Sequence, residues 1–110
     1  MLNSSEIKIL CDLLCDIGKQ YSTVCEIGYF GSYAKNTMNE KSDFDLVLFC
    51  NGYHEKTSIL NALLPLIKKF HILIHPIFYD KSKERVSENK FIKENIIENE
   101  IVIYRKVLTN

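Results

Sequence analysis

The stretch GSYAKNTMNEKSDFDLVLF, residues 31–49, decides the fold that this sequence predicts. Before it, residues 23–30 are rich in β-branched and aromatic side chains, which predicts a strand that runs into a tight turn at Gly31-Ser32. Ten residues separate Ser32 from Asp43, and the run from Asp43 to Cys50 becomes almost wholly apolar, as in a strand that starts at a solvent-facing rim and enters a buried sheet. Residues 33–39 are expected to form a short helix between the two strands.

Two carboxylates begin the second of these strands. Because residues two apart on a strand point to the same face, Asp43 and Asp45 are expected to lie together at the rim of the sheet. Magnesium prefers oxygen ligands and is usually held by one or two carboxylates together with the phosphates of a substrate. The pair therefore predicts a Mg²⁺ site that a phosphorylated substrate completes, and a second metal ion is compatible with it.

The Gly31-Ser32 turn supplies the other half of the predicted site. Glycine lets the backbone turn sharply and approach a ligand closely, and Ser32 offers its hydroxyl and amide to a phosphate at the start of the following helix. Alone, the pair is an ordinary turn, and an Asp-x-Asp pair alone is a solvated strand end. Their joint spacing and strand context indicate phosphoryl-transfer chemistry, in which the protein mainly positions groups and neutralises charge.

These residues resemble the signature of the polymerase-β-type nucleotidyltransferases, and the short chain resembles the minimal nucleotidyltransferase subgroup. Gly31, Ser32, Asp43 and Asp45 match the family pattern in place, and Ser42 before the first aspartate agrees with it. The resemblance is specific only between residues 31 and 46. It implies an α/β (α+β) fold with a small mixed sheet of three to four strands flanked by helices. It also implies Mg²⁺ dependence and transfer of a nucleoside monophosphate from an NTP, with ATP favoured, to an acceptor hydroxyl.

The sequence departs from the family pattern at two places. Active members usually carry a third carboxylate on a later strand, where Leu73 or His75 stands here. His75 is chemically suited to replace it as a general base, and a hydrogen-bonded structural histidine is the alternative. The family often has arginine and glycine where Lys35 and Asn36 stand, and Lys35 would contact a phosphate as a point charge. The predicted roles are catalytic for Asp43, Asp45 and His75, nucleotide-binding for Gly31, Ser32, Lys35 and Ser42, and metal-binding for Asp43 and Asp45.

The remaining segments predict helices around this sheet. Asn3 and Glu6 have capping-box spacing before an amphipathic helix that runs to Gly18, and residues 56–70 predict a second long helix that Pro65 kinks or ends early. Residues 71–80 predict a third strand at an edge or a bulge because of Pro76. On that strand one face is expected to carry His71, Leu73, His75 and Ile77.

The C-terminal third is more polar. Residues 82–98 are charged and expected to be helical in part, and residues 101–108 predict a fourth strand or a segment packed beside the sheet. Glu26, in the middle of the first strand, is interpreted as structural or solvent-facing. A solvated face of mixed sign is expected for Lys81, Lys83, Glu84, Arg85 and Glu88.

Composition limits the classes of protein that this chain fits. A chain of 110 residues, 46% hydrophobic, suits a single domain over residues 1–110, and its 14 basic and 14 acidic side chains exclude a generic nucleic-acid or membrane-surface binder. It carries neither a signal-like N-terminus nor a stretch of membrane-spanning length. Four cysteines in apolar surroundings suggest buried thiols and a cytoplasmic protein; Cys11 and Cys15 would share one helix face, as core residues or as a metal or redox pair.

Three hypotheses about function follow. In the first, the chain is an enzyme that modifies a hydroxyl of a partner protein, because a chain this short has little room for its own acceptor-binding domain. The family resemblance makes AMPylation of a HEPN-type toxin by its antitoxin the favoured example, in a homo- or hetero-oligomer. In the second, a catalytically degenerate module binds or neutralises a partner without turnover. In the third, which is less favoured, a small molecule is the acceptor.

Overall fold

The computed structural model describes residues 1–107, and its sheet has four strands in the order β3-β2-β1-β4. Strand β1 is antiparallel to both β2 and β4, whereas β2 and β3 are parallel, so the predicted small mixed sheet is confirmed. The elements in chain order are α1 Ser4–Gln20, β1 Val24–Phe30, α2 Gly31–Lys35, β2 Phe44–Cys50, α3 Lys56–Phe70, β3 Ile74–Tyr79, α4 Lys83–Val86, α5 Lys90–Asn95, the 3-10 helix η1 Ile97–Asn99, and β4 Ile101–Arg105.

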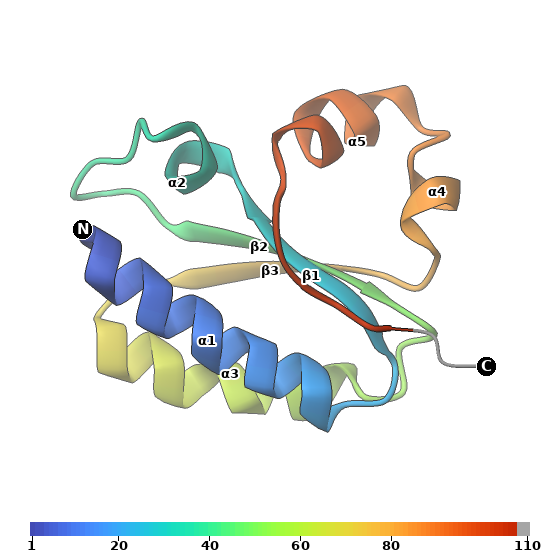
Figure 1. Ribbon diagram of the computed structural model, residues 1–110, viewed down its shortest axis with the longest axis horizontal. Coiled ribbons are helices and arrows are strands. Elements are labelled where there is room, and N and C mark those ends of the chain that lie inside the picture. Colours follow the sequence, from blue (N-terminus) through green and yellow to red (C-terminus); the bar gives the residue numbers. More distant parts are fainter. Residues whose placement is uncertain (108–110) are drawn as a thin grey trace.

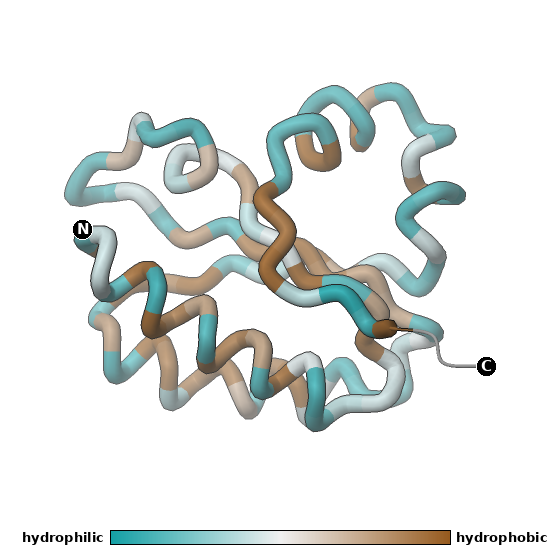
Figure 2. The backbone as a smooth tube through the Cα atoms, in the orientation of Figure 1, coloured by the Kyte–Doolittle hydropathy of each residue, from teal (hydrophilic) through white to brown (hydrophobic). Residues whose placement is uncertain are grey.

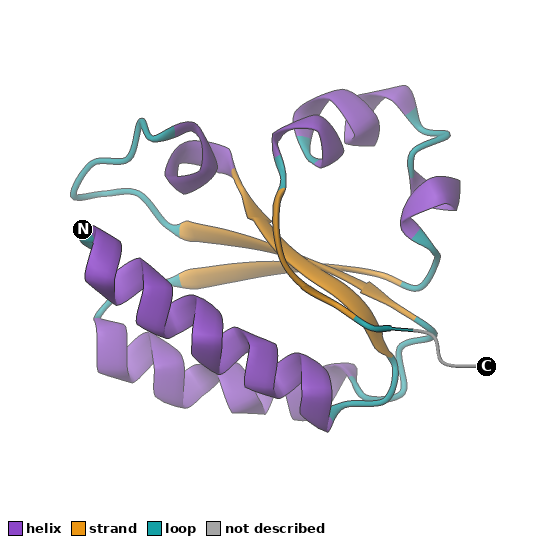
Figure 3. Cartoon of the chain, viewed as in Figure 1, coloured by secondary structure: helices purple, strands orange, loops and turns teal. Residues whose placement is uncertain are grey.

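Helices cover both faces of the sheet. Figure 1 shows α1 and α3 side by side on one face and α4 and α5 over the other, while α2 lies at one end. The secondary-structure view makes the same layers visible, with a long loop joining α2 to β2 (Figure 3). Apolar segments gather at the sheet and on the inner sides of the two long helices (Figure 2), as burial of apolar surface requires.

The alternation along β2 divides the core into two parts. Phe44, Leu46 and Leu48 are fully buried beneath α1 and α3. Val47 and Phe49 point to the other face, where Val86 and Ile96 cover them. Because side chains alternate along a strand, Asp45 belongs to this second face.

The first helix forms as predicted and runs two residues further. The Asn3 side chain accepts a hydrogen bond from the Glu6 N–H and the Glu6 carboxylate accepts one from the Asn3 N–H, so the capping box is present. Gly18 does not end the helix, because α1 continues to Gln20. A side chain at Gly18 would overlap the Tyr104 ring, so glycine lets α1 approach β4 closely.

Two expectations about α3 and β3 are corrected. Pro65 does not end α3, because Pro65 is exposed and the lost backbone hydrogen bond falls on the solvent side, between the buried Leu63 and Leu66. The helix ends at Phe70, where His71 takes the left-handed conformation with φ of 51°. The strand therefore begins at Ile74, and the prediction that His71 and Leu73 share a strand face with His75 is wrong. Its edge position agrees with Pro76.

The segments after the two ends of the sheet also differ in detail. The helix expected over residues 33–39 instead spans Gly31–Lys35 as α2. It ends there because Asn36 adopts a left-handed conformation that terminates it. Residues 82–98 are helical in part, as expected, and residues 101–105 form the fourth strand; Leu108 of the predicted segment lies outside the described residues. Within residues 1–107, no helix combines the length and the apolar character needed to cross a bilayer.

The cysteines correct one expectation in part. Cys50 is buried as expected, and burial raises the pKa of its thiol to about 11. Cys25 is exposed, and Cys11 and Cys15 are half-buried on α1. The Cys15 thiol donates to the Ile103 carbonyl and so contacts β4. All four cysteines are free thiols. The prediction of buried thiols holds for Cys50, which is buried, and is wrong for Cys25, which is exposed.

Candidate active site

The Gly31 turn lies directly against Asp45. Phe30, the last residue of β1, is the register partner of Asp45 on β2, so the chain turns at the level of this carboxylate. Gly31 has φ of 72°, in the left-handed region, and a Cβ atom on it would overlap Asp45 Oδ2. Glycine is therefore required both for the turn and for the space that the carboxylate occupies.

The two predicted carboxylates differ in their surroundings. Asp43 is exposed just before β2 begins, whereas the Asp45 side chain is 27% exposed. Burial raises the pKa of Asp45 above its ordinary value, the neighbouring His75 lowers it, and the charge of Asp43 raises it. Asp43 and Asp45 stand two residues apart at the start of β2, so both carboxylates belong to this rim.

His75 stands beside Asp45 on the neighbouring strand. The parallel register pairs Asp45 with His75, and His75 Nδ1 lies 3.6 Å from Asp45 Oδ1. The His75 side chain is 64% exposed, so solvent or an acceptor reaches its other nitrogen. Leu73 lies before the strand, and its carbonyl accepts the Phe44 N–H at 2.9 Å. Of the two residues considered for the place of the third acid, His75 is therefore the one beside Asp45.

An aromatic cluster anchors the start of β2, and sequence reasoning missed it. Phe44, between the two aspartates, is fully buried with its ring centroid 5.0 Å from that of Tyr29 and 5.4 Å from that of Tyr33 on α2. The Tyr33 hydroxyl accepts a hydrogen bond from the Leu2 N–H at 3.0 Å. These contacts hold α2 and the start of β2 together. The signal in the sequence was the aromatic residue placed between the two acids.

The other predicted nucleotide-binding residues lie on α2 and in the loop that joins it to β2. Ser32 is half-buried in the first turn of α2, and no described residue forms a hydrogen bond with its hydroxyl. Lys35 is exposed at the end of α2. The Ser42 hydroxyl oxygen accepts the Asn39 N–H at 2.9 Å, so Ser42 closes the loop that leads to Asp43. The structure thus gives Ser42 a loop-forming contact alongside its predicted role.

The donor set suits a hard divalent cation that a substrate completes. Among residues 1–107, no cluster of three or more histidine, cysteine or acidic side chains has the arrangement of a preformed metal centre. Asp43 and Asp45 offer carboxylate oxygens only, which are the ligands that Mg²⁺ prefers, and the absent Cβ of Gly31 leaves room for Asp45. These residues would therefore fit a magnesium ion whose coordination is completed by substrate phosphates better than they would fit a metal ion held by the protein alone.

A separate cleft lies at the opposite end of the sheet. It has a volume of about 530 Å³ and is lined by residues from the start of β1, the end of β2, α4 and the end of β4, among them Glu26, Lys83 and Arg105. None of the predicted site residues lines it. The nucleotide site predicted from sequence therefore lies at the rim formed by Gly31 and Asp45, outside this cleft.

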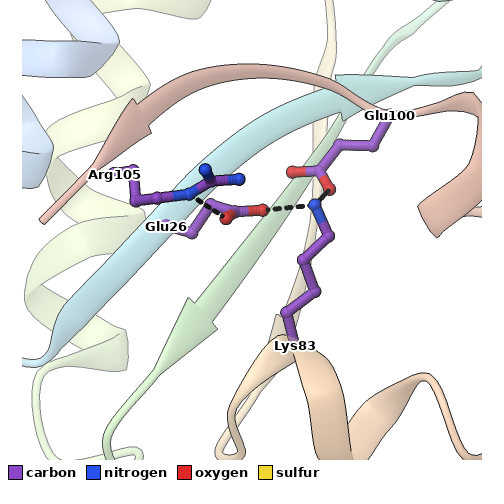
Figure 4. Close-up of polar contacts among 4 residues, drawn as sticks. All are labelled: Glu26, Lys83, Glu100 and Arg105. Atoms are coloured by element: carbon purple, nitrogen blue, oxygen red, sulfur yellow. Dashed lines mark hydrogen bonds and ion pairs between the residues drawn. The ribbon is translucent and has the colours of Figure 1, made fainter.

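Residues that line the cleft decide between the two interpretations of Glu26 and correct the interpretation of Lys83. Glu26 is 5% exposed and therefore structural, not solvent-facing. Lys83 does not belong to a solvated face, because its Nζ lies 3.0 Å from Glu26 Oε2 and 2.8 Å from Glu100 Oε1 (Figure 4). Arg105 Nε donates to Glu26 Oε1 at 2.9 Å. Sequence reasoning missed Glu100, because its partners are distant along the chain.

Comparison with known proteins shows the family of this chain and relatives of its fold. The family model described as "Nucleotidyltransferase domain" matches residues 7–106, so the chain belongs to the nucleotidyltransferase domain family, whose class is that of transferases. The fold also resembles three solved structures, each covering 96% of this chain. No curated protein matches the sequence.

The three structures are distant in sequence. A toxin-antitoxin crystal structure with AMP-PNP is 13% identical with a TM-score of 0.61 and 75% of its chain covered. A mutant of the toxin-antitoxin MntA-HpeT, in which two aspartates two residues apart are changed to glutamate, is 15% identical with a TM-score of 0.63 and 75% covered. A Sulfolobus solfataricus protein described as a candidate nucleotidyltransferase is 15% identical with a TM-score of 0.51 and 91% covered. At these identities the likeness shows the fold.

Proposed function

We propose that this chain is a Mg²⁺-dependent nucleotidyltransferase that transfers a nucleoside monophosphate, AMP from ATP in the favoured case, to a hydroxyl of a partner protein. The observation that carries the proposal is the left-handed Gly31 turn seated against Asp45, with Asp43 beside it. This arrangement joins a backbone turn that can approach phosphates to a pair of carboxylates that suits their counter-ion.

Each residue has a chemical role in this proposal. The Ser32 amide and hydroxyl would hold the triphosphate, Lys35 would contact a phosphate as a point charge, and Ser42 would shape the loop near it. Asp43 and Asp45 would hold Mg²⁺, with a second ion compatible. When bound, the metal supplies neutralisation of charge on the attacking and leaving oxygens.

The transfer step balances with the groups named here. The acceptor oxygen forms a bond to the α-phosphorus, the bond from that phosphorus to the bridging oxygen breaks, and pyrophosphate leaves. His75 would accept the hydroxyl proton, because it is exposed beside Asp45 where the family's third acid is expected. The alternative is that His75 only orients Asp45.

The partner is proposed to be a HEPN-type toxin, with this chain as its antitoxin. Two of the structures that share the fold are toxin-antitoxin structures, one of them with AMP-PNP. The two aspartates replaced in the MntA-HpeT mutant have the same spacing as Asp43 and Asp45. We place the reaction in the cytoplasm, within a homo- or hetero-oligomer and without membrane or nucleic acid as a substrate.

Label transfer from ATP tests this proposal. The chain and a co-encoded HEPN-type protein, incubated with Mg²⁺ and α-labelled ATP, should yield labelled partner that EDTA abolishes. Asp43→Asn with Asp45→Asn should reduce labelling at least about 100-fold, because the carboxylates that hold the metal are lost. Asp80→Asn, an exposed change away from this rim, is the matched control. Equal labelling with all three proteins would contradict the proposal, and the other NTPs are tested in parallel.

The second candidate is a binding module that neutralises its partner without turnover. What favours it is that β3 places His75, not a third acid, at the register position of Asp45. In that case the partner would bind to this chain and be inhibited without acquiring label, and the Asp43→Asn, Asp45→Asn double variant would inhibit equally well. Labelling without any partner would instead favour a small-molecule acceptor.

A further inference from the structure

The segment from Lys83 to Asn99 forms a cap over the face of the sheet to which Asp45 belongs. It comprises α4, α5 and η1 between β3 and β4 (Figure 1). Val86 and Ile96 of this cap are buried against Val47 and Phe49 of β2. We call residues 83–99 the cap.

Both ends of the cap meet at one buried cluster of charges. Lys83 is its first residue, and Glu100 follows its last residue directly. Lys83 Nζ joins Glu100 Oε1 at 2.8 Å and Glu26 Oε2 of β1 at 3.0 Å (Figure 4). The Glu100 side chain is fully buried and that of Lys83 is 25% exposed. The ion pair of Lys83 with Glu100 thus joins the two ends of the cap, and the ion pair of Lys83 with Glu26 attaches the cap to the central sheet.

The room for this cluster depends on a glycine. A Cβ atom on Gly28 of β1 would overlap the Glu100 carboxylate, so the missing side chain provides the space in which Glu100 lies against the sheet. Glu26 Oε2 and Glu100 Oε1 are buried, and Lys83 Nζ is the cation that meets both of them, at 3.0 and 2.8 Å. Charge attraction through Lys83 therefore holds the cluster together.

The part of the cap formed by α5 and η1 lies toward the candidate active site. Phe30, Ile92 and Ile97 all pack against the same buried apolar cluster that joins β2 to the cap, and η1 contacts α2. Phe30 immediately precedes Gly31 and is the register partner of Asp45. A displacement of the cap would therefore reach the turn at Gly31 through Phe30 and α2.

We infer that Lys83 is a positioning residue: by joining Glu26 and Glu100 it seats the cap against Phe30 and so holds the Gly31-Ser32 turn beside Asp45. The inference rests on the proposed function only for the link between the cap and nucleotide transfer, which the transfer assay measures. The seating of the cap is a property of the fold and can be measured without nucleotide.

The cluster also gives the cap a dependence on pH. The charged groups that face Glu100 are Glu26 from β1 and Lys83 from α4, with Arg105 of β4 paired to Glu26. Burial, and secondly the nearby Glu26, raise the pKa of Glu100 to about 7 against the attraction of Lys83. Protonated Glu100 can donate a hydrogen bond to the Glu26 carboxylate, whereas ionised Glu100 and Glu26 repel each other. The cap should therefore open more often as pH rises through neutrality.

Hydrogen exchange of the full chain, followed by mass spectrometry, tests the inference. Lys83→Met should accelerate exchange in residues 90–99 about tenfold or more relative to wild type, with α1 unchanged, because two buried carboxylates lose their counter-ion. Lys83→Arg should restore most of the protection. Lys93→Met, an exposed lysine of the same cap without an ion pair to a described residue, is the matched control. Exchange in Lys83→Met equal to that in Lys93→Met would overturn the inference.

The pH profile provides a second measurement if Lys83→Met does not fold. After correction for intrinsic rates, wild-type exchange in residues 90–99 should rise about tenfold between pH 6 and 8, and Glu100→Gln should abolish this rise. A rise retained in Glu100→Gln would overturn the inference. In the transfer assay, Lys83→Met should raise KM for ATP more than it lowers kcat. Wild-type chain without transfer activity contradicts the proposed function alone, because the exchange result stands without nucleotide.

Discussion

At the scale of single residues, Gly31 combines a left-handed backbone with a steric limit set by Asp45. Gly31→Ala should lower the free energy of unfolding by about 1–2 kcal/mol from backbone strain. It should also reduce label transfer by at least about tenfold, because the new methyl group must displace the Asp45 carboxylate. Chemical denaturation and the transfer assay measure the two effects.

Gly52→Ala is the matched control for Gly31→Ala. Gly52 has φ of 94°, so alanine there is strained in the same way, but its Cβ would lie 3.4 Å from the His54 ring and far from Asp45. Gly52→Ala should therefore lose stability while transfer by the folded protein is retained. Equal loss of transfer in both variants would show that strain alone accounts for the effect of Gly31→Ala.

His75 is the second residue whose role can be separated from structure. If it accepts the acceptor's proton, His75→Gln should lower kcat by about 10²- to 10⁴-fold with little change in ATP affinity. Little stability should be lost, because the His75 side chain is 64% exposed. His54→Gln, another exposed histidine, provides the comparison in steady-state kinetics. Unchanged kcat in His75→Gln would remove His75 from the chemistry.

At the scale of elements, Phe44 fastens β2 to α2 and β1. Its ring is fully buried between Tyr29 and Tyr33, so Phe44→Ala should lower the free energy of unfolding by about 3–5 kcal/mol. Phe44→Leu, which retains most of the apolar volume, should lose less, and Phe91→Ala, at a 72% exposed position, should lose little. Urea denaturation measures all three. A small loss for Phe44→Ala would contradict the anchoring role.

At the scale of the whole molecule, Glu100 links stability to pH. Its pKa is about 7 in the folded protein against an ordinary value of 4.5, so the folded state binds the proton more tightly than the unfolded chain. The stabilising contribution of protonated Glu100 to the free energy of unfolding is therefore fully present below about pH 4.5 and is lost as pH rises to about 7. Glu26 affects stability in the opposite direction. Burial alone would raise its pKa, but hydrogen bonds with Glu100, Lys83 and Arg105 lower it below the ordinary 4.5, so its stabilising contribution is lost as pH falls below about 4.5.

Substitution of Glu100 isolates this effect. Glu100→Gln mimics the protonated side chain and should be more stable than wild type at pH 8.5 by about 1–3 kcal/mol, with the difference vanishing near pH 4.5. Glu98→Gln, two residues earlier on the exposed side of η1, should leave the wild-type profile unchanged. The test is urea denaturation over this pH range, and parallel profiles for wild type and Glu100→Gln would contradict the assignment.

Local patterns in the sequence were enough to predict the central unit of the fold. The apolar run after Asp43, the turn at Gly31 and the capping box at Asn3 each depend on neighbours within a few residues, and the structure contains the strand, the turn and the cap that they predict. Helix α3 spans residues 56–70 as predicted, but of the two expectations for Pro65, a kink or an early end, the early end is wrong, because the tolerance of proline in a helix depends on which side faces solvent. The roles assigned to Ser32, Lys35 and His75 stay predictions.

The sequence by itself determined the order of strands and helices and the spacing that brings Gly31 and Asp45 to one rim, because side-chain period and turn chemistry are local properties. Only the tertiary structure decided that His75, not Leu73, lies beside Asp45, since that depends on where α3 ends and on the parallel register of β2 and β3. It also decided that Lys83 bridges Glu26 and Glu100. Those three residues lie far apart in the chain, and a buried ion pair forms only where folding removes water from charges that meet.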